Sequence, residues 1–156
     1  MKLIHQTIIN ILKLSLSIIF LTAGVSKIFY YRGFTQEIAQ YFELYLFSLP
    51  AVSYRYIAVF LIITEIAIGF CLQIKKIVLP TIILMFLLLS AFWYLNMLNY
   101  FFPSIIGSVE SCGCFGELIQ FTPAGSFYKS MTIWTLSLYL LIYMIMINRP
   151  HCKKGA

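Results

Sequence analysis

Residues 77–102 read IVLPTIILMFLLLSAFWYLNMLNYFF and contain no Asp, Glu, Lys, Arg or His. A helix needs about 20 mostly apolar residues to cross the hydrocarbon core of a bilayer, so this stretch predicts a transmembrane helix. Three further stretches meet the same criterion, at about residues 7–30, 52–74 and 128–147. The hydropathy pattern therefore predicts an all-α fold, a four-helix transmembrane bundle.

The composition points to the same class of protein. The chain has 156 residues, of which 62% are hydrophobic and 10% are charged, whereas about a quarter of the residues in a soluble domain are charged. The length accommodates one bundle, so we expect residues 1–156 to form a single membrane domain in contact with the lipid bilayer. The net charge is +6, but the basic residues flank apolar runs as membrane anchors do, which argues against nucleic-acid binding.

The first apolar stretch shares two features with a signal peptide. It has a basic start, with Lys2 and His5, and a pair of small residues at Ala23 and Gly24. A signal peptide, however, has an apolar region of about 7–15 residues followed by a polar cleavage region. Here the apolar character continues to Tyr30, so we expect this stretch to be retained as a transmembrane helix.

Lysine and arginine residues cluster at three places that share one side of a four-span arrangement. These are Lys2 at the N-terminus, Lys75 and Lys76 in the second connection, and Arg149, Lys153 and Lys154 in the C-terminal tail. Short loops rich in Lys and Arg face the cytoplasm, so we expect a bacterial inner (cytoplasmic) membrane protein with both termini in the cytoplasm. The third connection, residues 103–127, then faces the periplasm and carries Cys112 and Cys114.

The connection between the first two spans has the pattern of a short amphipathic helix over residues 34–47. Apolar side chains recur there at helical spacing, and polar side chains occupy much of the other side. The apolar positions are Phe34, Ile38, Tyr41, Phe42 and Tyr45, and the polar positions are Glu37, Gln40 and Glu43. We expect this helix to lie in the membrane interface and to end before Pro50.

The periplasmic connection contains two cysteines that are one glycine apart, Cys112-Gly113-Cys114. A disulfide needs its two Cα atoms within about 7 Å, and Gly113 can adopt the unusual backbone angles that so small a ring requires. Such a ring is usually strained, and strain makes a disulfide easier to reduce. The pair is therefore suited to exchanging electrons with a partner dithiol, which predicts Cys112 and Cys114 as catalytic residues.

Three other interpretations of this pair stay open: an inert bridge, two unpaired packing residues, and half of a metal site. Copper(I) favours soft thiolates, whereas structural zinc sites usually have four protein ligands. The two histidines, His5 and His151, are both expected on the cytoplasmic side. We therefore expect no metal site at Cys112 and Cys114.

Three charged residues fall inside the expected spans: Lys13, Lys27 and Glu65. At 1.5 Å per residue, Lys13 lies roughly 10 Å and Glu65 roughly 13 Å from the inner ends of their spans, which predicts a Lys13–Glu65 pair. Lys27 is near the outer end, too far from Glu65 by depth, and can extend to water. These charges either fix helix register or line a cavity, for a quinone or for proton transfer. Asn96 and Asn99 are expected to form hydrogen bonds between helices.

Three segments together resemble the MauE branch of the DoxX-like membrane proteins. They are residues 20–28 (FLTAGVSKI), 65–69 (EIAIG) and 112–116 (CGCFG). The resemblance implies a four-helix membrane protein that is linked to disulfide formation in exported proteins and to a thioredoxin-like periplasmic partner. It also implies that Cys112 and Cys114 are the redox pair. Relatives are associated with quinone-linked oxidation, and the resemblance makes Lys27 and Glu65 the motif charges of the first two spans. Because these two charges lie inside the spans, we expect them to be the cofactor-binding residues if a quinone binds.

The leading hypothesis is an inner-membrane thiol–disulfide redox protein that supports disulfide formation or maturation of exported proteins. If it is an enzyme, it is a thiol–disulfide oxidoreductase, passing electrons between an exported thioredoxin-like partner and a membrane carrier such as a quinone. The alternative is a non-catalytic membrane scaffold or assembly factor whose cysteines form a fixed disulfide. A small transporter is a third alternative, but the spans offer few polar residues to line a path.

Overall fold

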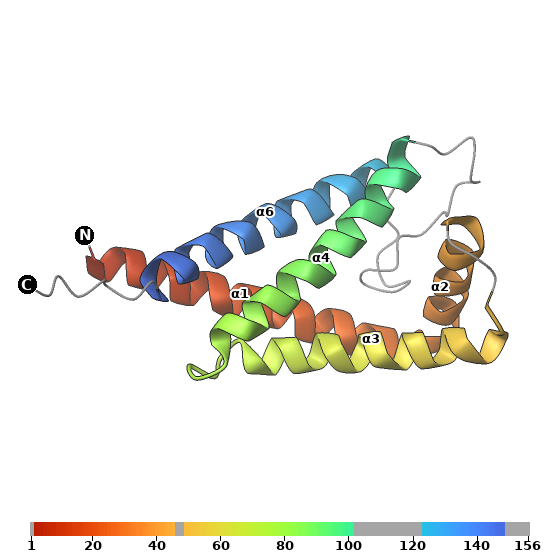
Figure 1. Ribbon diagram of the computed structural model, residues 1–156, viewed down its shortest axis with the longest axis horizontal. Coiled ribbons are helices and arrows are strands. Elements are labelled where there is room, and N and C mark those ends of the chain that lie inside the picture. The colour runs from red at the N-terminus through yellow and green to blue at the C-terminus, as the bar shows by residue number, and fades with distance from the viewer. Residues whose placement is uncertain (1, 46–48, 102–122, 149–156) are drawn as a thin grey trace, which may run out of the picture.

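The computed structural model describes residues 2–45, 49–101 and 123–148, and every element within these ranges is a helix. In chain order the helices are α1 (Lys2–Phe29), α2 (Tyr31–Tyr45), α3 (Ala51–Cys71), α4 (Val78–Phe101) and α6 (Pro123–Asn148) (Figure 1). Four helices are long and apolar enough to cross a membrane: Gln6–Phe29, Ala51–Cys71, Val78–Phe101 and Ala124–Ile147. The expected all-α, four-helix transmembrane bundle is confirmed.

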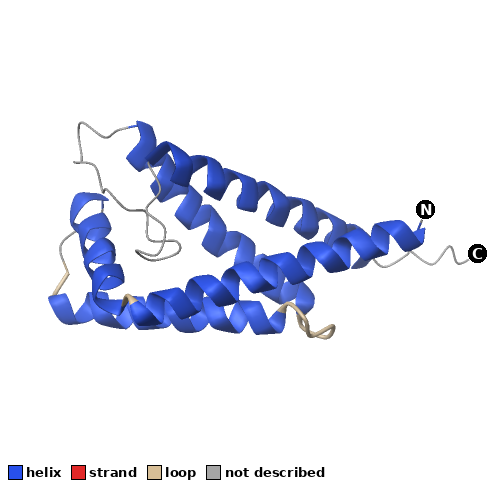
Figure 2. Cartoon of the chain, turned by 180° about the vertical axis from the view of Figure 1, so that it is seen from behind, coloured by secondary structure: helices blue, strands red, loops and turns tan. Residues whose placement is uncertain are grey.

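The four long helices form two antiparallel pairs. α1 packs mainly against α3, and α4 mainly against α6, while residues 72–77 connect the two pairs (Figure 1; Figure 2). The end of the bundle at which α2 lies, called the α2 end below, also holds the last turns of α1 and α4 and the first turns of α3 and α6. The opposite end, called the turn end, holds residues 72–77, the start of α1 and the end of α6. The start of α1, the second connection and the end of α6, which leads into the C-terminal tail, therefore share one end of the bundle.

The fourth span begins earlier in the chain than its hydropathy indicated. α6 starts at Pro123, whereas the apolar run suggested a start near residue 128. Proline is favoured in the first turn of a helix, because its missing N–H has no helical partner there and its φ angle is already helical. The last residues of the expected third connection, residues 123–127, therefore belong to the helix.

Small residues let α1 and α3 approach each other closely. A Cβ atom placed on Gly24 would lie 2.6 Å from the Ile66 side chain. One placed on Gly69 would lie 2.6 Å from Leu21 Cγ and 3.2 Å from the Ser17 carbonyl oxygen. The Ser17 hydroxyl also donates a hydrogen bond of 2.5 Å to the Gly69 carbonyl oxygen. These contacts set Ser17 opposite Gly69, so the first turns of α1 extend beyond the end of α3.

The buried charged and amide side chains lie in one half of the bundle. Toward the turn end the main buried cluster is apolar and comprises Ile9, Leu16, Phe20, Ile68, Leu72, Val78, Ile82, Met85 and Leu140. The polar side chains buried beside it, Ser17, Thr81 and Ser137, donate hydrogen bonds to backbone carbonyl oxygens. The half nearer α2 contains many buried polar side chains: Ser26, Lys27, Glu37, Glu65, Asn96, Asn99, Ser126 and Ser130. Polar and ionisable groups are costly inside a membrane and usually mark functional regions. The half nearer α2 is therefore the place to look for a site.

α2 is the helix expected between the first two spans, and it crosses one end of the bundle (Figure 1). Phe34 and Ile38 are buried in a cluster with Tyr54 and Ala58 of α3. The expectation that Glu37 lies on the polar side was wrong, because its side chain is buried, at 9% exposed. At about 100° per residue, Glu37 lies only about 60° from Phe34 around the helix, so the buried face carries it inward. The placement of α2 in the membrane interface stays a prediction.

We expect Gly69→Leu to destabilise the protein, because the new side chain would collide with Leu21 and with the backbone of α1. Overpacking of this kind typically costs about 1–3 kcal/mol, and the midpoint of thermal unfolding in detergent measures the loss. Ala67→Leu is the matched control, because Ala67 is exposed on the same helix. Equal losses in the two variants would contradict a special role of Gly69 in the α1–α3 contact.

Candidate functional site

The most deeply buried charges among the described residues are Lys27 of α1 and Glu65 of α3. Lys27 is 0% exposed and Glu65 is 3% exposed. The Lys27 ammonium donates a hydrogen bond to Glu65 Oε1, and the two groups form an ion pair. A buried charge is tolerated only when it is paired and hydrogen-bonded, so these two side chains must lie together for the helices to pack.

The expected Lys13–Glu65 pair is wrong, because the depths were counted as if the ends of the two helices were level. Ser17 lies opposite Gly69, near the end of α3, so Lys13 lies beyond the region that faces Glu65. Side chains on a helix also lean toward its N-terminus. Because α1 and α3 are antiparallel, this lean carries the Lys27 side chain toward the turn end and the Glu65 side chain toward the α2 end. The two side chains therefore meet between their backbone positions.

Aromatic rings close over the Lys27 ammonium. Nζ lies 4.7 Å from the centroid of the Phe34 ring on α2 and 5.0 Å from the centroid of the Phe92 ring on α4. A cation near a ring face is stabilised by about 0.5–1 kcal/mol at exposed sites and by about 2 kcal/mol when it is desolvated. The ion pair and its two rings therefore tie together α1, α2, α3 and α4.

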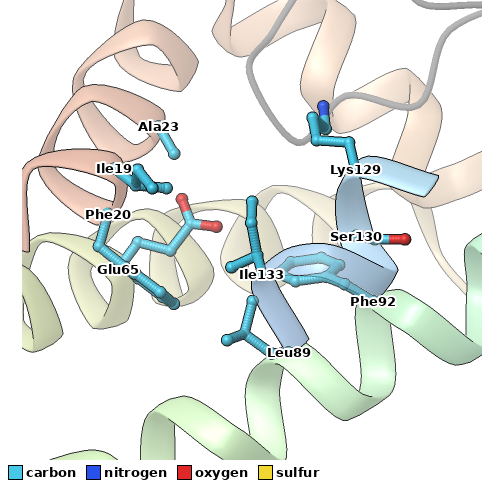
Figure 3. Close-up of a pocket in the computed structure, with 9 residues that line it drawn as sticks. All are labelled: Ile19, Phe20, Ala23, Glu65, Leu89, Phe92, Lys129, Ser130 and Ile133. Carbon is cyan, nitrogen blue, oxygen red and sulfur yellow. The ribbon is translucent and has the colours of Figure 1, made fainter. Parts of the chain in front are cut away.

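A cavity of about 40 Å³ borders Glu65. Figure 3 shows the Glu65 carboxylate directed toward this space, between α1, α4 and α6. The other residues that line it are Ile19, Phe20, Ala23, Leu89, Phe92, Lys129, Ser130 and Ile133. Glu65 Oε2 is buried and has no hydrogen-bond partner among the described residues. Buried polar atoms are nearly always hydrogen-bonded, so this oxygen is available to a donor on a small ligand or on water.

A second cavity, of about 90 Å³, lies between α2, α3 and α4. It is lined by Phe34, Glu37, Ile38, Tyr41, Phe42, Ile57, Leu61, Phe92, Leu95 and Asn96. The ion pair borders the first cavity directly through Glu65, and it meets the second through the Phe34 and Phe92 rings that flank Lys27. Small-molecule sites are typically lined by apolar and aromatic side chains with a few polar groups, and both cavities have that character.

The structure brings together two of the site residues expected from the sequence, Lys27 and Glu65. The other two, Cys112 and Cys114, lie outside the described residues, in the segment that connects two helix ends at the α2 end. Cys71 is a free, half-buried thiol at the turn end. Within residues 2–45, 49–101 and 123–148, no three His, Cys, Asp or Glu side chains are grouped as ligands for a metal ion.

Three residues of the site escaped the sequence reasoning: Phe34, Glu37 and Phe92. The position of Glu37 around α2, at the edge of the apolar face, was a signal that could have found it. Phe34 was assigned to that face, but nothing in the pattern showed that it would cover a lysine. Phe92 is one of many apolar residues in an uncharged span, so only packing distinguishes it from its neighbours.

Comparisons with known proteins cover most of the chain. The family model described as "Methylamine utilisation protein MauE" matches residues 5–147. Among curated proteins, the chain is similar to Protein TlpB of Flavobacterium psychrophilum, with 26% identity over 144 residues. The match covers 87% of this chain and 36% of the relative, so the chain spans about a third of the length of the curated relative that it matches. No solved structure matches the chain.

We expect Lys27→Met and Glu65→Leu each to lower the free energy of unfolding by about 3–5 kcal/mol, because either change leaves a buried charge without its partner. The double variant removes both charges and should recover much of this loss. Unfolding of the single and double variants in detergent measures the coupling between the two positions.

The control is the same cycle with Lys13→Met in place of Lys27→Met. Lys13 and Glu65 have no shared contact in the structure, so their effects should add to within about 0.5 kcal/mol. A coupling of Lys13 to Glu65 as strong as that of Lys27 would contradict the observed register of α1 on α3.

Proposed function

The chain belongs to the MauE family and is a multi-pass membrane protein, and from this premise we propose that it is a thiol–disulfide redox protein of the bacterial inner membrane. In this proposal Cys112 and Cys114 exchange electrons with an exported thioredoxin-like partner. The exchange supports disulfide formation in, or maturation of, exported proteins. The description of the family names methylamine utilisation, but no residue of the site points to that substrate, and we do not carry it over.

The observation that carries the proposal is the buried Lys27–Glu65 pair in the half of the bundle nearer α2. The segment with Cys112 and Cys114 connects the end of α4 to the start of α6, and both of these helix ends lie at the α2 end. Both ends of the cysteine segment therefore lie at the same end of the bundle as the costly buried charges. This arrangement suits transfer of electrons from thiols to an acceptor inside the bundle.

We propose a quinone as that acceptor, beside Lys27 and Glu65. A quinone accepts the two electrons and two protons that a Cys112/Cys114 dithiol releases when it closes to a disulfide. The residues present fit such a ligand, because Phe92 and most of the other walls are apolar, with Lys129 and Ser130 as polar exceptions, and Glu65 Oε2 can accept a hydrogen bond from a hydroxyl group. Lys27 has three N–H donors, so it can bond a carbonyl oxygen while it still holds Glu65.

The size of the cavities adds a requirement to this proposal. A cavity of about 150 Å³ holds benzene, whereas the two cavities here measure about 40 and 90 Å³. Neither is large enough alone for a ring. Phe92 lines both of them. Joining the two cavities is still not enough for a ring, so the Phe92 side chain would also have to move out and vacate its own volume to make room for a quinone next to the ion pair.

We also propose that the α2 end faces the periplasm and that both termini lie in the cytoplasm. The turn end holds Lys75 and Lys76, which are exposed, and the start of α1. Basic residues of short loops favour the cytoplasmic side. This orientation would give the cysteine segment access to an oxidising compartment and to exported partners.

The second candidate function is a non-catalytic scaffold or assembly factor whose cysteines form a fixed disulfide. The ion pair favours it in one respect, because Lys27 and Glu65 hold four helices together whether or not a ligand binds. A transporter has less support. The buried charged and amide side chains occupy the half nearer α2. Toward the turn end the buried polar side chains, Ser17, Thr81 and Ser137, donate to backbone carbonyl oxygens and offer little to line a polar path.

Alkylation gel-shifts during a redox titration separate exchange from a fixed bridge. A Cys71→Ser/Cys152→Ser background leaves Cys112 and Cys114 as the reactive thiols. We expect a midpoint potential well above about −300 mV, because structural disulfides usually lie below that value. A pair that stays oxidised to lower potentials would support the scaffold, and full activity of Cys112→Ser or Cys114→Ser would exclude both thiol mechanisms.

Reduction of a short-chain quinone by dithiothreitol, with the protein in liposomes, tests the role of the buried pair. Lys27→Met/Glu65→Leu should stay folded, since it removes both charges of the buried pair together, and should lower the rate at least about tenfold. Lys13→Met is the control and should keep the wild-type rate. An unchanged rate in the double variant would contradict the quinone site. The redox titration tests thiol exchange at Cys112 and Cys114 independently of that result.

A further inference from the structure

At the α2 end, an open cleft of about 620 Å³ lies where α1 passes into α2, beside the first turns of α3. It is lined by Tyr31, Arg32, Thr35, Gln36 and Arg55. Both arginines are exposed, and neither forms an ion pair with a carboxylate of the described residues. Each guanidinium offers five N–H donors and a permanent positive charge. Two such groups in one cleft, without an ion-paired acid among the described residues, suit an anion.

Aromatic side chains place this cleft at the depth of lipid headgroups. Phe29, the last residue of α1, is 79% exposed, and Tyr56, near the start of α3, is 72% exposed. Tyr30 and Tyr31 follow Phe29 directly in the chain. Tyrosines at the ends of membrane-spanning helices, here Tyr56, Tyr30 and Tyr31, mark the boundary between the hydrocarbon core and the headgroups. At this depth, the lipid headgroups supply an anion, the phosphate group.

A largely apolar groove runs along the last turns of α1, just before the chain reaches the residues of the cleft. It has a volume of about 370 Å³ and is lined by Leu21, Thr22, Val25, Ser26 and Phe29. Phe29 lines the groove and Tyr31 lines the cleft, and two residues so close in the chain have Cα atoms within about 7 Å of each other. From Thr22 to Phe29 the groove runs about 10 Å along a membrane-spanning helix, a length and depth that match part of an acyl chain.

We propose that the cleft and the groove together bind one anionic phospholipid. Its phosphate pairs with Arg32 and Arg55, and one acyl chain lies against Val25 and Phe29. Arginine suits this ligand because its planar fork donates two parallel hydrogen bonds to a phosphate. An acidic segment of a partner protein would satisfy the arginines but leave the groove at hydrocarbon depth unfilled, whereas a phospholipid fills both. The site is distinct from the Lys27–Glu65 pair and does not rest on the redox proposal.

Native mass spectrometry of the full chain, purified in detergent and mixed with phosphatidylglycerol, tests this site. One lipid should stay bound to the wild-type protein, and Arg32→Gln/Arg55→Gln should weaken its binding at least about tenfold. Lys75→Gln/Lys76→Gln removes the same charge at the turn end and should leave this lipid bound. Val25→Trp, on an exposed position of α1, should weaken binding by filling the groove.

Three competing ligands complete the test. Phosphatidylcholine has the same phosphate but a cationic headgroup, so it should bind at least about tenfold more weakly than phosphatidylglycerol. Inorganic phosphate and a polyglutamate peptide, each at equal concentration, should not displace the lipid. Displacement by phosphate would mean that the groove plays no part, and displacement by the peptide would point to a protein ligand. Either result, or equal losses in the arginine and lysine variants, would overturn the proposal.

Discussion

A lysine and a glutamate buried inside one membrane-spanning bundle, Lys27 and Glu65, constrain the packing around them. Removing each charge from water costs several kcal/mol even after relaxation, so the two side chains must meet. The glycines at the α1–α3 contact, Gly24 and Gly69, allow close approach in the same register that brings the charges together. Electrostatics and shape therefore select one arrangement of α1 on α3. The hydrogen bond from Ser17 to the Gly69 carbonyl oxygen stabilises it further.

The position of this pair explains why α2 and α4 pack over the half of the bundle nearer α2. The apolar core at the turn end needs nothing beyond close packing, whereas the half nearer α2 has to accommodate charge, and α2 and α4 supply the rings of Phe34 and Phe92 that cover it. Charges interact far more strongly in a low-dielectric interior than in water. The uncompensated oxygen of Glu65 beside an apolar cavity would therefore bind a hydrogen-bond donor firmly. The cysteine segment joins helices at this same end of the molecule.

α2 connects the buried site with the membrane surface. Its inward side carries Phe34 against Lys27 and places Glu37 in the second cavity. Its outward side carries Arg32 and Gln36 into the open cleft beside α3. One short helix thus contributes to two hollows of opposite character. One is largely apolar and lies against the Phe34 and Phe92 rings that cover Lys27, and the other is open, polar and cationic. Since the helix is short and contacts mainly α3, the packing of Phe34 over the lysine also contributes to holding it in place.

Hydropathy and charge alone established the four spans, because an uncharged run such as residues 77–102 has few stable environments outside a bilayer. The amphipathic spacing after the first span likewise indicated α2, and Lys27 and Glu65 stood out because charges inside apolar runs are rare. Only the tertiary structure decided which lysine pairs with Glu65. The register between two helices depends on contacts among residues far apart in the chain, and a count of depth along each helix does not contain them. For the same reason the burial of Glu37 and the position of Phe92 at both cavities became apparent only when the helices were packed together.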